Sequence, residues 1–589
     1  MESFLRNEIG GKNMKKLFAM LMVGAMALTA TGCGSNDGSS KGGSTAQNTL
    51  TVGATDLKGQ FSPIYYETAY DGYAIDLIYQ SLLNYDVESN LVPQIAAEMP
   101  TVSKDGKKIT FKLKDGLKFS DGSTLDANDV KFTFTVVADP SYDSRFGSTS
   151  ENIVGYDEYH NKENTSATEL TGIKVIDPLT VEFNLKTTRV DALADIGTTF
   201  GIISDEQFKD YKRGDTKMFK DNLENPIGSG PYKLNKWDKA SGASFVFNEN
   251  YPAEEGKYQV KNIIIKPVET STEYNELEKG TVDLLPTAIE SSKIGPASLN
   301  ENLTYNSYPR AGMGYISYNT TQGPTADKAV RQALTYAFDR QSFVDSYYSF
   351  EKASDEVKKA KLGYVPTAFL NPASPLGNIV RGETKLNGLE TYKYDIEKAK
   401  SILDEAGWTV GADGIREKDG QKLTIKLMSA TEVADLMNNL VPVWQDGWAK
   451  QLGVDLKQTT VDFNTLTEKV TDDEALGEWN VFFMAVGFTG ASLTEINNTF
   501  LSTASGRDGN YARVNDPSID KYLNAGLNTA DEKVAEDNYK KAIIAANEYC
   551  AYVPVYGNTY FDLYNKRVKG LKTGPVYTWA DAMADVTLE

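Results

Sequence analysis

The chain has 589 residues, with 61 Lys and Arg against 81 Asp and Glu, which gives a net charge of −20 at pH 7. So acidic a chain argues against nucleic acid as a partner and against adhesion to anionic lipid, since both need a basic surface. Its hydrophobic and aromatic contents, 40% and 11%, argue against disorder, and its length predicts two or three domains. The one histidine, His160, excludes metal sites built from several imidazoles, and we expect neither a metal nor a cofactor.

The beginning of the chain has the organisation of an export signal. Lys15 and Lys16 precede the apolar residues 17–30, a run shorter than the roughly 20 residues that a membrane-spanning helix needs. We therefore predict a signal peptide over residues 1–32. The true start is expected at Met14, because that residue opens a Met-Lys-Lys sequence.

The end of this signal carries a cysteine. Residues 28–33 resemble the lipobox of bacterial lipoproteins, in which the thiol is acylated, so Cys33 is the predicted lipid attachment site. Residues 33–48 are rich in Gly and Ser, which predicts a flexible tether. The second cysteine, Cys550, lies in an apolar run and is predicted to be a buried thiol. No intramolecular disulfide is expected, since Cys33 carries the lipid.

Short strands predominate in the first half of the chain. Strands are expected at residues 49–52, 109–113, 175–185, 233–237 and 263–268, and helices at 73–83, from Asp126 onward and at 272–279. The polar residues 141–171 are expected to form a surface excursion. Residues 226–232 contain Gly228-Ser229-Gly230 between prolines and predict a turn-dense hinge. No helix opens behind these glycines, which argues against a phosphate loop.

Helical periodicity is stronger in the second half. Helices are expected from Asp327, from Asp395 to Gly407, at 433–452 and at 532–549, and strands at 423–428, 480–487 and 553–556. Asp395 and Gly407 are the residue types expected to cap a helix at its start and end. The mixture predicts an α/β fold without strict alternation of helices and strands.

Five of these stretches, in this order, resemble the cluster-5 extracellular solute-binding proteins, the oligopeptide- and dipeptide-binding lipoprotein family of ABC transporters. They are residues 109–130, which include Lys-Asp-Gly-Leu-Lys-Phe-Ser-Asp-Gly, and residues 226–232, 280–283, 327–340 and 394–408. The resemblance extends over about residues 49–568.

The resemblance implies a two-lobed, periplasmic-binding-protein-like α/β fold of type II, cluster C, with an extra inserted domain. The expected segments are residues 49–85, 171–285 and 556–589 for domain I, 86–170 for domain II and 286–555 for domain III. Two strands that cross between domains I and III would serve as the hinge. Solute would be enclosed when the lobes close.

By the same resemblance, the ligand-binding residues lie on two walls of a cleft and on the strand after the hinge. They are Glu67, Thr68, Ala69, Gly487, Phe488, Thr489, Ala491 and Tyr556. Two alternatives stay open at single positions. Glu67 is also typical of a solvated loop carboxylate, and Phe488 of a core residue at the end of a strand.

Ala491 departs from the family pattern. Peptide binders of this family usually have an Asp at the matching position, which pairs with the α-amino group of the ligand, and a buried ammonium without a partner is costly. Glu495 would take this role only if the loop were rearranged. Otherwise the ligand lacks a free amino terminus, or it is a sugar that stacks on tyrosines.

These features favour a monomeric, lipid-anchored solute-binding component of an ABC importer on the outer face of the cytoplasmic membrane, and not an enzyme. It would capture peptides or peptide-like solutes between its lobes and deliver them to the permease and its ATPase subunits. One alternative is the same transport role for an oligosaccharide. Another is a sensor or adhesion lipoprotein that keeps the fold without transport.

Two short motifs offer other chemistries. Residues 518–521 (Ser-Ile-Asp-Lys) and 572–574 (Lys-Thr-Gly) match two parts of a serine acyl-enzyme set, but no serine lies between them to supply the middle element. A secreted serine hydrolase is therefore a remote alternative. Residues 472–474 (Asp-Asp-Glu) lack the alternating ligands and the Gly of a calcium loop, and are expected to be solvated surface.

Overall fold

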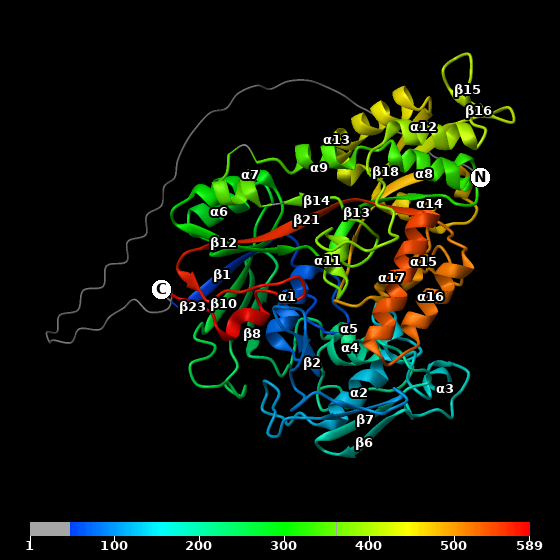
Figure 1. Ribbon diagram of the computed structural model, residues 1–589. Helices are drawn as coiled ribbons and strands as arrows, with labels where there is room; N and C mark the ends of the chain where they lie inside the picture. Colours follow the sequence, from blue (N-terminus) through cyan, green and yellow to red (C-terminus); the bar gives the residue numbers. More distant parts are fainter. Residues whose placement is uncertain (1–47, 351, 361) are drawn as a thin grey trace, which may run out of the picture. The chain divides into compact units, whose positions relative to one another are not determined.

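The computed structural model describes residues 48–350, 352–360 and 362–589 (Figure 1). The predicted signal peptide, Met14, Cys33 and the predicted tether up to residue 47 lie outside the described residues. The described residues all belong to one compact unit. None of the helices in the described ranges has the length and apolar character that crossing a membrane requires.

A 12-stranded mixed sheet runs through this unit (Figure 1). Its strands, in order of pairing, are β19 (Asp455–Val461), β18 (Thr424–Ala430), β20 (Val481–Gly487), β13 (Gly312–Tyr318), β21 (Tyr552–Asn565), β11 (Leu284–Ala288), β1 (Thr49–Ala54), β10 (Asn262–Pro267), β9 (Gly242–Phe247) and β8 (Tyr232–Asp238), while β12 (Leu303–Pro309) and β14 (Gly363–Tyr364) also pair with β21.

A four-stranded antiparallel sheet is separate from it, and three smaller sheets complete the β structure. Their strands are β4 (Thr101–Val102), β5 (Lys108–Lys112), β7 (Thr180–Asn184) and β6 (Ile173–Asp177); β2 (Leu83–Tyr85) with β3 (Leu91–Pro93); β15 (Thr409–Val410), β16 (Arg416–Lys418) and β17 (Gln421–Lys422); and β22 (Val568–Lys569) with β23 (Thr587–Leu588).

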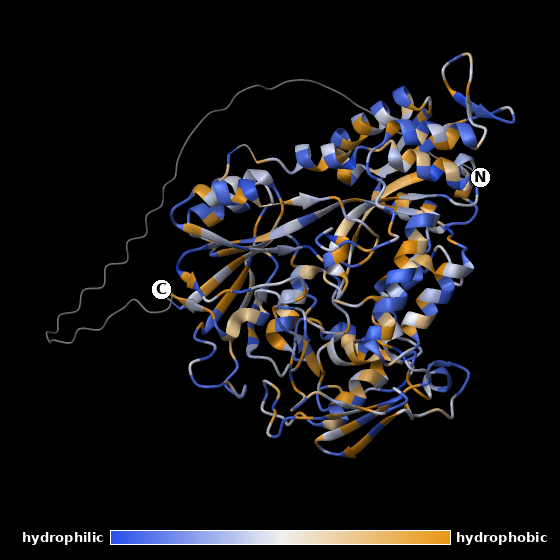
Figure 2. Ribbon diagram, in the orientation of Figure 1, coloured by the Kyte–Doolittle hydropathy of each residue, from blue (hydrophilic) through white to orange (hydrophobic). Residues whose placement is uncertain are grey.

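The α-helices cover these sheets. They are α1 (Ala69–Ile78), α2 (Ala127–Val137), α3 (Tyr156–His160), α4 (Ala192–Thr198), α5 (Lys217–Asp221), α6 (Glu273–Glu278), α7 (Ser291–Leu299), α8 (Lys328–Tyr336), α9 (Arg340–Tyr347), α10 (Asp355–Lys359), α11 (Gly377–Val380), α12 (Ile396–Glu405), α13 (Ala434–Trp444), α14 (Phe463–Thr471), α15 (Asn497–Phe500), α16 (Pro517–Leu527) and α17 (Glu532–Tyr549). Figure 2 shows both a hydrophobic and a hydrophilic side along α17, as expected for a helix that packs on one face.

The β20 strand shows how helices cover both faces of the sheet. Val481 and Phe483 lie in a core with residues of α8, α12 and α13. Phe482 and Met484 point to the opposite face and pack with residues of α16 and α17. This alternation follows from the two-residue period of a strand, and a run of apolar residues indicates a strand that is buried on both faces.

One long strand, β21, joins the two halves of the sheet. Its first residues pair with β13, where Tyr556 lies opposite Gly314, and residues 559–565 pair with β12. The first and second halves of the chain also touch away from this strand. The N–H of Val190 donates to the carbonyl of Leu527 at 2.9 Å.

A polar clamp holds the start of β1. The Arg567 guanidinium donates to the carbonyl oxygen of Thr49 and to the Asp283 carboxylate, each at 2.7 Å. The same carboxylate accepts the N–H of Thr51 at 2.9 Å. The first strand of the fold is therefore tied to residues far along the chain.

Three predicted helix starts are confirmed. Asp126, Asp327 and Asp395 are the N-caps of α2, α8 and α12, and each side chain accepts a backbone N–H of the first turn. The predicted stop at Gly407 is also confirmed, because this residue follows α12 with φ +84°, which glycine adopts without strain.

The helix predicted at residues 73–83 lies earlier in the chain, as α1. It begins after Thr68, whose hydroxyl accepts the N–H of Asp71 at 3.1 Å, and it ends at Ile78. The Ile78 carbonyl accepts the N–H of Gly230 at 2.7 Å, and a Cβ on Gly230 would lie 2.5 Å from the Leu77 carbonyl oxygen. The predicted hinge glycines therefore pack against the end of α1.

The surface excursion predicted at residues 141–171 is confirmed for most of the segment, whose residues are largely exposed or half-buried, but a few of its apolar side chains are buried. Ile153 and Leu170 are fully buried and Tyr159, in α3, is 1% exposed. Because the segment is rich in polar residues, its sequence pattern does not indicate which of its apolar side chains pack inward. The long helix predicted at 433–452 is present, but its second part, residues 445–451, is a π-helix.

A buried carboxylate makes the stability of this fold sensitive to pH. Burial raises the pKa of Asp129, which is 2% exposed in the first turn of α2, from 3.8 to about 7. The folded protein therefore binds an extra proton between these values, and the free energy of unfolding falls as pH rises through this range. One proton accounts for at most about 1.4 kcal/mol per pH unit.

Urea denaturation in steps from pH 4 to pH 8 measures this dependence. The Asp129→Asn variant, which cannot titrate, is expected to lose stability less steeply with rising pH than the unmodified chain. If the stability of the two proteins depended equally on pH, the raised pKa of Asp129 would be contradicted.

Candidate functional site

Several of the predicted ligand-binding residues lie together at one end of β13. Gly487 pairs with Gly312, and the N–H of Phe488 donates to the carbonyl of Ala311 at 2.8 Å. Tyr556 crosses the same end of β13 on its other side. A Cβ on Gly314 would lie 2.2 Å from the Tyr556 ring, so a glycine is required there.

The two aromatic residues predicted to contact the ligand are partly buried in the core. Tyr556 is 8% exposed and stacks on Phe483 with ring centroids 6.5 Å apart. Burial raises the pKa of its hydroxyl group. Phe488 is half-buried and meets Phe369 edge-on at 6.4 Å. Only part of each ring is left to contact a solute.

The loop after β20 is held by Glu495. One oxygen of this carboxylate accepts the N–H groups of Thr489 at 2.8 Å and Gly490 at 3.2 Å. The other accepts the side-chain amide of Asn371 at 2.6 Å. Burial raises the pKa of Glu495. Both oxygens of the Glu495 carboxylate thus already accept hydrogen bonds from the protein. The neighbouring Ala491 is 8% exposed.

The other predicted wall, residues 67–69, lies at the start of α1. Glu67 is exposed, and Thr68 is the N-cap of the helix. Within the described residues, no hydrogen bond or ion pair joins this segment directly to residues 487–491. Next to it, the Arg145 guanidinium lies over the rings of Tyr66 and Phe146, at 4.5 and 4.6 Å from their centroids.

Tyrosines of α1 and β21 lie near each other. Burial raises the pKa of Tyr73, in α1, and the nearby Asp562 and Tyr560 of β21 contribute to the shift. The Tyr560 ring lies 6.2 Å from that of Tyr308 and 5.7 Å from the guanidinium of Arg310. The sequence analysis did not identify Arg310. It lies in the short link between β12 and β13, and only strand pairing shows what surrounds it.

Two cavities in the described part of the chain lie away from these residues. One, of about 820 Å³, is lined by residues that include Arg340 and Tyr392. The other, of about 620 Å³, is lined by residues that include Lys328 and Tyr549. None of the predicted ligand-binding residues lines either cavity.

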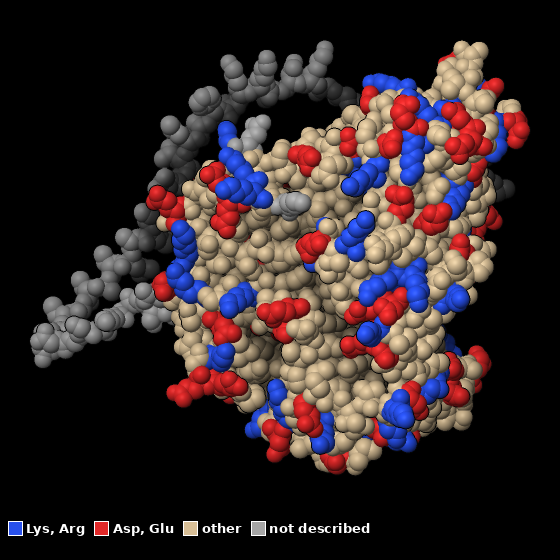
Figure 3. All heavy atoms as spheres, in the orientation of Figure 1, with Lys and Arg blue, Asp and Glu red and all other residues tan. Residues whose placement is uncertain are grey.

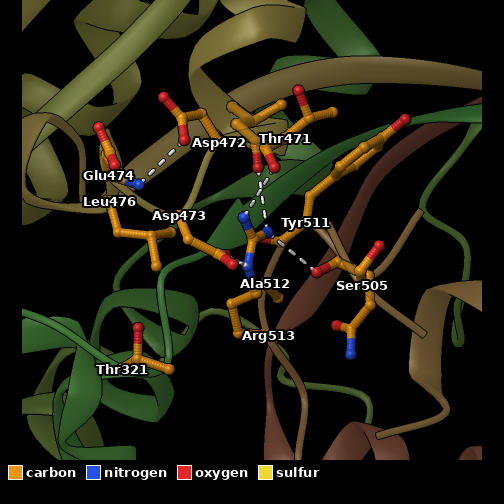
Figure 4. Close-up of polar contacts among 12 residues, drawn as sticks. Thr321, Thr471, Asp472, Asp473, Glu474, Leu476, Ser505, Tyr511, Ala512 and Arg513 are labelled. Carbon is orange, nitrogen blue, oxygen red and sulfur yellow. Dashed lines mark hydrogen bonds and ion pairs between the residues drawn. The ribbon is translucent and has the colours of Figure 1, made fainter. Parts of the chain in front are cut away.

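The two competing motifs have structural roles. The Ser518 hydroxyl donates to the N-cap Asp516 of α16 at 2.6 Å, which is the bonding of a helix start and not of an activated nucleophile. In the acidic run, Asp473 pairs with Arg513 at 2.7 Å, and Figure 4 shows this guanidinium among backbone carbonyls. Within the described ranges no three His, Cys, Asp or Glu side chains gather as a metal site would need.

Charges of both signs are interspersed on the face drawn in Figure 3. The net charge of −20 is therefore not gathered into one acidic patch on that face.

The large mixed sheet, the strand that joins its halves and the separate four-stranded sheet define a two-lobed α/β solute-binding fold of type II. The family described as bacterial extracellular solute-binding proteins, family 5 Middle, matches residues 90–508. The chain belongs to this family of extracellular proteins. It is therefore a solute-binding protein and not an enzyme, which confirms the resemblance, the fold class and the absence of enzymatic function expected from the sequence.

Relatives with known names cover most of the chain. The nickel-binding periplasmic protein of Escherichia coli is 26% identical over 82% of this chain and 84% of its own length. The dipeptide-binding protein of the same organism is 26% identical over 86% and 89%. The solved oligopeptide-binding protein AppA of Bacillus subtilis, in complex with a nonapeptide, has a TM-score of 0.69 at 21% identity over 92% and 99%.

Proposed function

We propose that the protein is the solute-binding component of an ABC importer for peptides or peptide-like solutes, and that it delivers them as a monomer to a permease and its ATPase subunits. The observation that carries this proposal is an open strand edge at the candidate site. The register of β20 with β18 ends at Phe482, whereas its pairing with β13 continues to Gly487.

The open edge presents backbone groups. Because the Phe488 N–H bonds to Ala311, the alternation of an antiparallel pair directs the N–H and C=O groups of Ala485 and Gly487 away from β13. Both residues are exposed. An extended peptide can add to such an edge through main-chain hydrogen bonds, which accept many side-chain sequences.

Calorimetry and thermal shift with pools of di- to nonapeptides, and with oligosaccharides as a comparison, test the proposal. Peptides are expected to raise the melting temperature, since a ligand at 100 times its Kd stabilises by about 2.7 kcal/mol. Stabilisation by oligosaccharides alone, or by no pool member, would overturn the peptide assignment.

The Ala485→Pro variant removes one N–H from the open edge and leaves the bonds to β13 in place. Peptide binding is expected to weaken about tenfold, the equivalent of one hydrogen bond. Ala485→Ser retains the N–H and is the matched control. Unchanged peptide affinity in the proline variant would show that peptides do not bind along this edge.

A lipid on Cys33 would keep the protein at the outer face of the membrane. The lipobox-like residues 28–33 support this part of the proposal. Mass spectrometry of the membrane-extracted protein is expected to find an acylated Cys33, and the Cys33→Ser variant is expected in the medium. Recovery of an unmodified Cys33 from membranes would contradict a lipid anchor.

The surroundings of Ala491 favour a second candidate, a solute without a free amino terminus. Glu495 bonds to its own loop, and Ala491 offers no charge for an ammonium group. Peptides with an acetylated amino terminus, or oligosaccharides, would then bind at least as tightly as peptides with a free amino terminus.

A further inference from the structure

The cavity of about 820 Å³ is lined by residues at the start of α9, by residues 365–367 and by the loop that connects α11 to α12. Its volume is within the range of about 300–1,000 Å³ that is usual for small-molecule sites. None of the predicted ligand-binding residues lines it, so it is separate from the candidate solute site.

The charge of this cavity wall is opposite in sign to that of the chain. Arg340, Lys385 and Lys393 line the cavity, whereas no Asp or Glu of the described ranges does, although the chain has 81 acidic and 61 basic residues. In the same ranges, none of these three cations forms an ion pair with an acidic side chain. The wall therefore attracts an anion.

The acidic residues close to these cations in the sequence are already hydrogen-bonded to other groups. They are Asp339 and Asp395, the N-caps of α9 and α12, Glu383, which pairs with Arg381, and Glu390, which accepts the N–H of Tyr392. Since none of these four carboxylates lines the cavity, they leave its positive charge in place.

Arg340 is a buried part of the wall. It is 5% exposed, and within the described ranges its guanidinium donates only to backbone carbonyls, those of Pro554 and Thr391 at 2.8 Å and of Tyr392 at 2.9 Å. Burial lowers the pKa of Arg340 from 12.5 to about 10, so the group stays charged at neutral pH. A buried charge without an opposite charge is costly, and a bound anion would remove part of this cost.

Much of the remaining wall is apolar and aromatic. Phe338 is fully buried, Val365, Leu386 and Leu389 are half-buried, and Tyr394 is 41% exposed. A ligand that covers apolar surface gains by the hydrophobic effect, and an aromatic ring offers it a flat face. The cavity thus suits an apolar body as well as an acid group.

Hydrogen bonds hold the cavity walls in place. Asn547 is 8% exposed, and its side-chain amide donates to the carbonyls of Thr367 at 2.7 Å and Glu390 at 2.9 Å, which joins two of the lining segments. The carbonyl of Asn547 accepts the Tyr392 hydroxyl at 2.8 Å. Walls that are fixed before a ligand binds lower the entropic cost of binding.

We propose that this cavity is a second binding site, which takes an organic anion with an apolar body, such as an aromatic or a fatty carboxylate. The apolar body covers Leu386 and Leu389, and the acid group is held by the three cations. The site does not depend on the proposed function, because it shares no residue with the candidate solute site.

Two fluorescent probes test the site in the full chain. 1-Anilinonaphthalene-8-sulfonate and N-phenyl-1-naphthylamine have the same aromatic body, but only the first carries an acid group. Titrations compare the unmodified protein, a cavity variant with Lys385→Gln and Lys393→Gln, and a matched control variant with Lys174→Gln and Lys239→Gln. The two control lysines are exposed and line neither cavity.

The unmodified protein is expected to bind the sulfonate about tenfold or more tightly than the neutral amine. The cavity variant is expected to lose most of this preference, whereas the control variant retains it. Unchanged binding of the neutral amine shows that the cavity variant is folded. Equal affinity of the unmodified protein for both probes, binding of neither probe, or a preference that persists in the cavity variant would overturn the site.

Competition identifies the class of anion. Displacement of the sulfonate by decanoate but not by naphthalene-2-carboxylate supports a lipid-like ligand, and the reverse result supports an aromatic acid. Displacement by neither carboxylate overturns the proposal.

Discussion

Replacement of Arg331 by Met is expected to lower the free energy of unfolding by about 3–5 kcal/mol. A loss of this size is typical of a mutation that breaks a buried polar network. Arg331 is 2% exposed and belongs to α8, and its guanidinium lies between the residues that precede this helix and the end of α17. Its guanidinium donates to four backbone carbonyls, those of Thr325, Ala326, Tyr549 and Cys550. Met fills a similar volume but leaves these buried acceptors unpaired.

Chemical denaturation followed by circular dichroism measures this loss. Arg507→Met is the matched control, since it removes an exposed arginine and is expected to change stability by no more than about 0.5 kcal/mol. A similar small change in Arg331→Met would show that water replaces the guanidinium at these carbonyls.

Replacement of Asp71 by Ala is expected to cost about 3 kcal/mol of stability and also to weaken solute binding. Asp71 is fully buried in the first turn of α1. Its carboxylate accepts three consecutive backbone N–H groups, those of residues 58–60, and the Thr68 hydroxyl at 2.8 Å. These bonds fix the loop that precedes the predicted wall at residues 67–69, so their loss frees that wall.

Asp71→Asn separates the two effects, because the amide oxygen can still accept the N–H groups while the amide nitrogen cannot accept the hydroxyl. Its loss of stability is expected to be smaller than that of Asp71→Ala, with peptide affinity closer to the unmodified value. If Asp71→Ala lost stability but bound peptides with full affinity, residues 67–69 would not contact the solute.

Local chemistry made much of the fold predictable from the sequence. The caps at Asp126, Asp327 and Asp395 could be found because a cap is a contact between residues three apart or fewer. The end of α1 could not, because a hydrogen bond from Gly230 to Ile78 sets it, and periodicity contains no information on that partner.

The candidate site was predictable only in part. Residues 487–489 and Tyr556 were found by resemblance, and strand pairing through β13 does bring them together; their contact with a solute stays a prediction. Arg310 was not found, because arginine is an ordinary residue type in a short link between two strands. Only the pairing of β12 with β21 shows that it lies beside Tyr560.

The clamp at the start of β1 has a mechanical consequence for a protein that we propose to be tethered. A pull on the chain at Thr49 is directed along β1, whose six residues pair with β10 in parallel, so the hydrogen bonds are loaded in shear and must fail together. The bond from Arg567 to the Thr49 carbonyl stiffens this attachment point. A force on the tethered protein would therefore act on β1, which lies away from the open edge of β20 in the sheet.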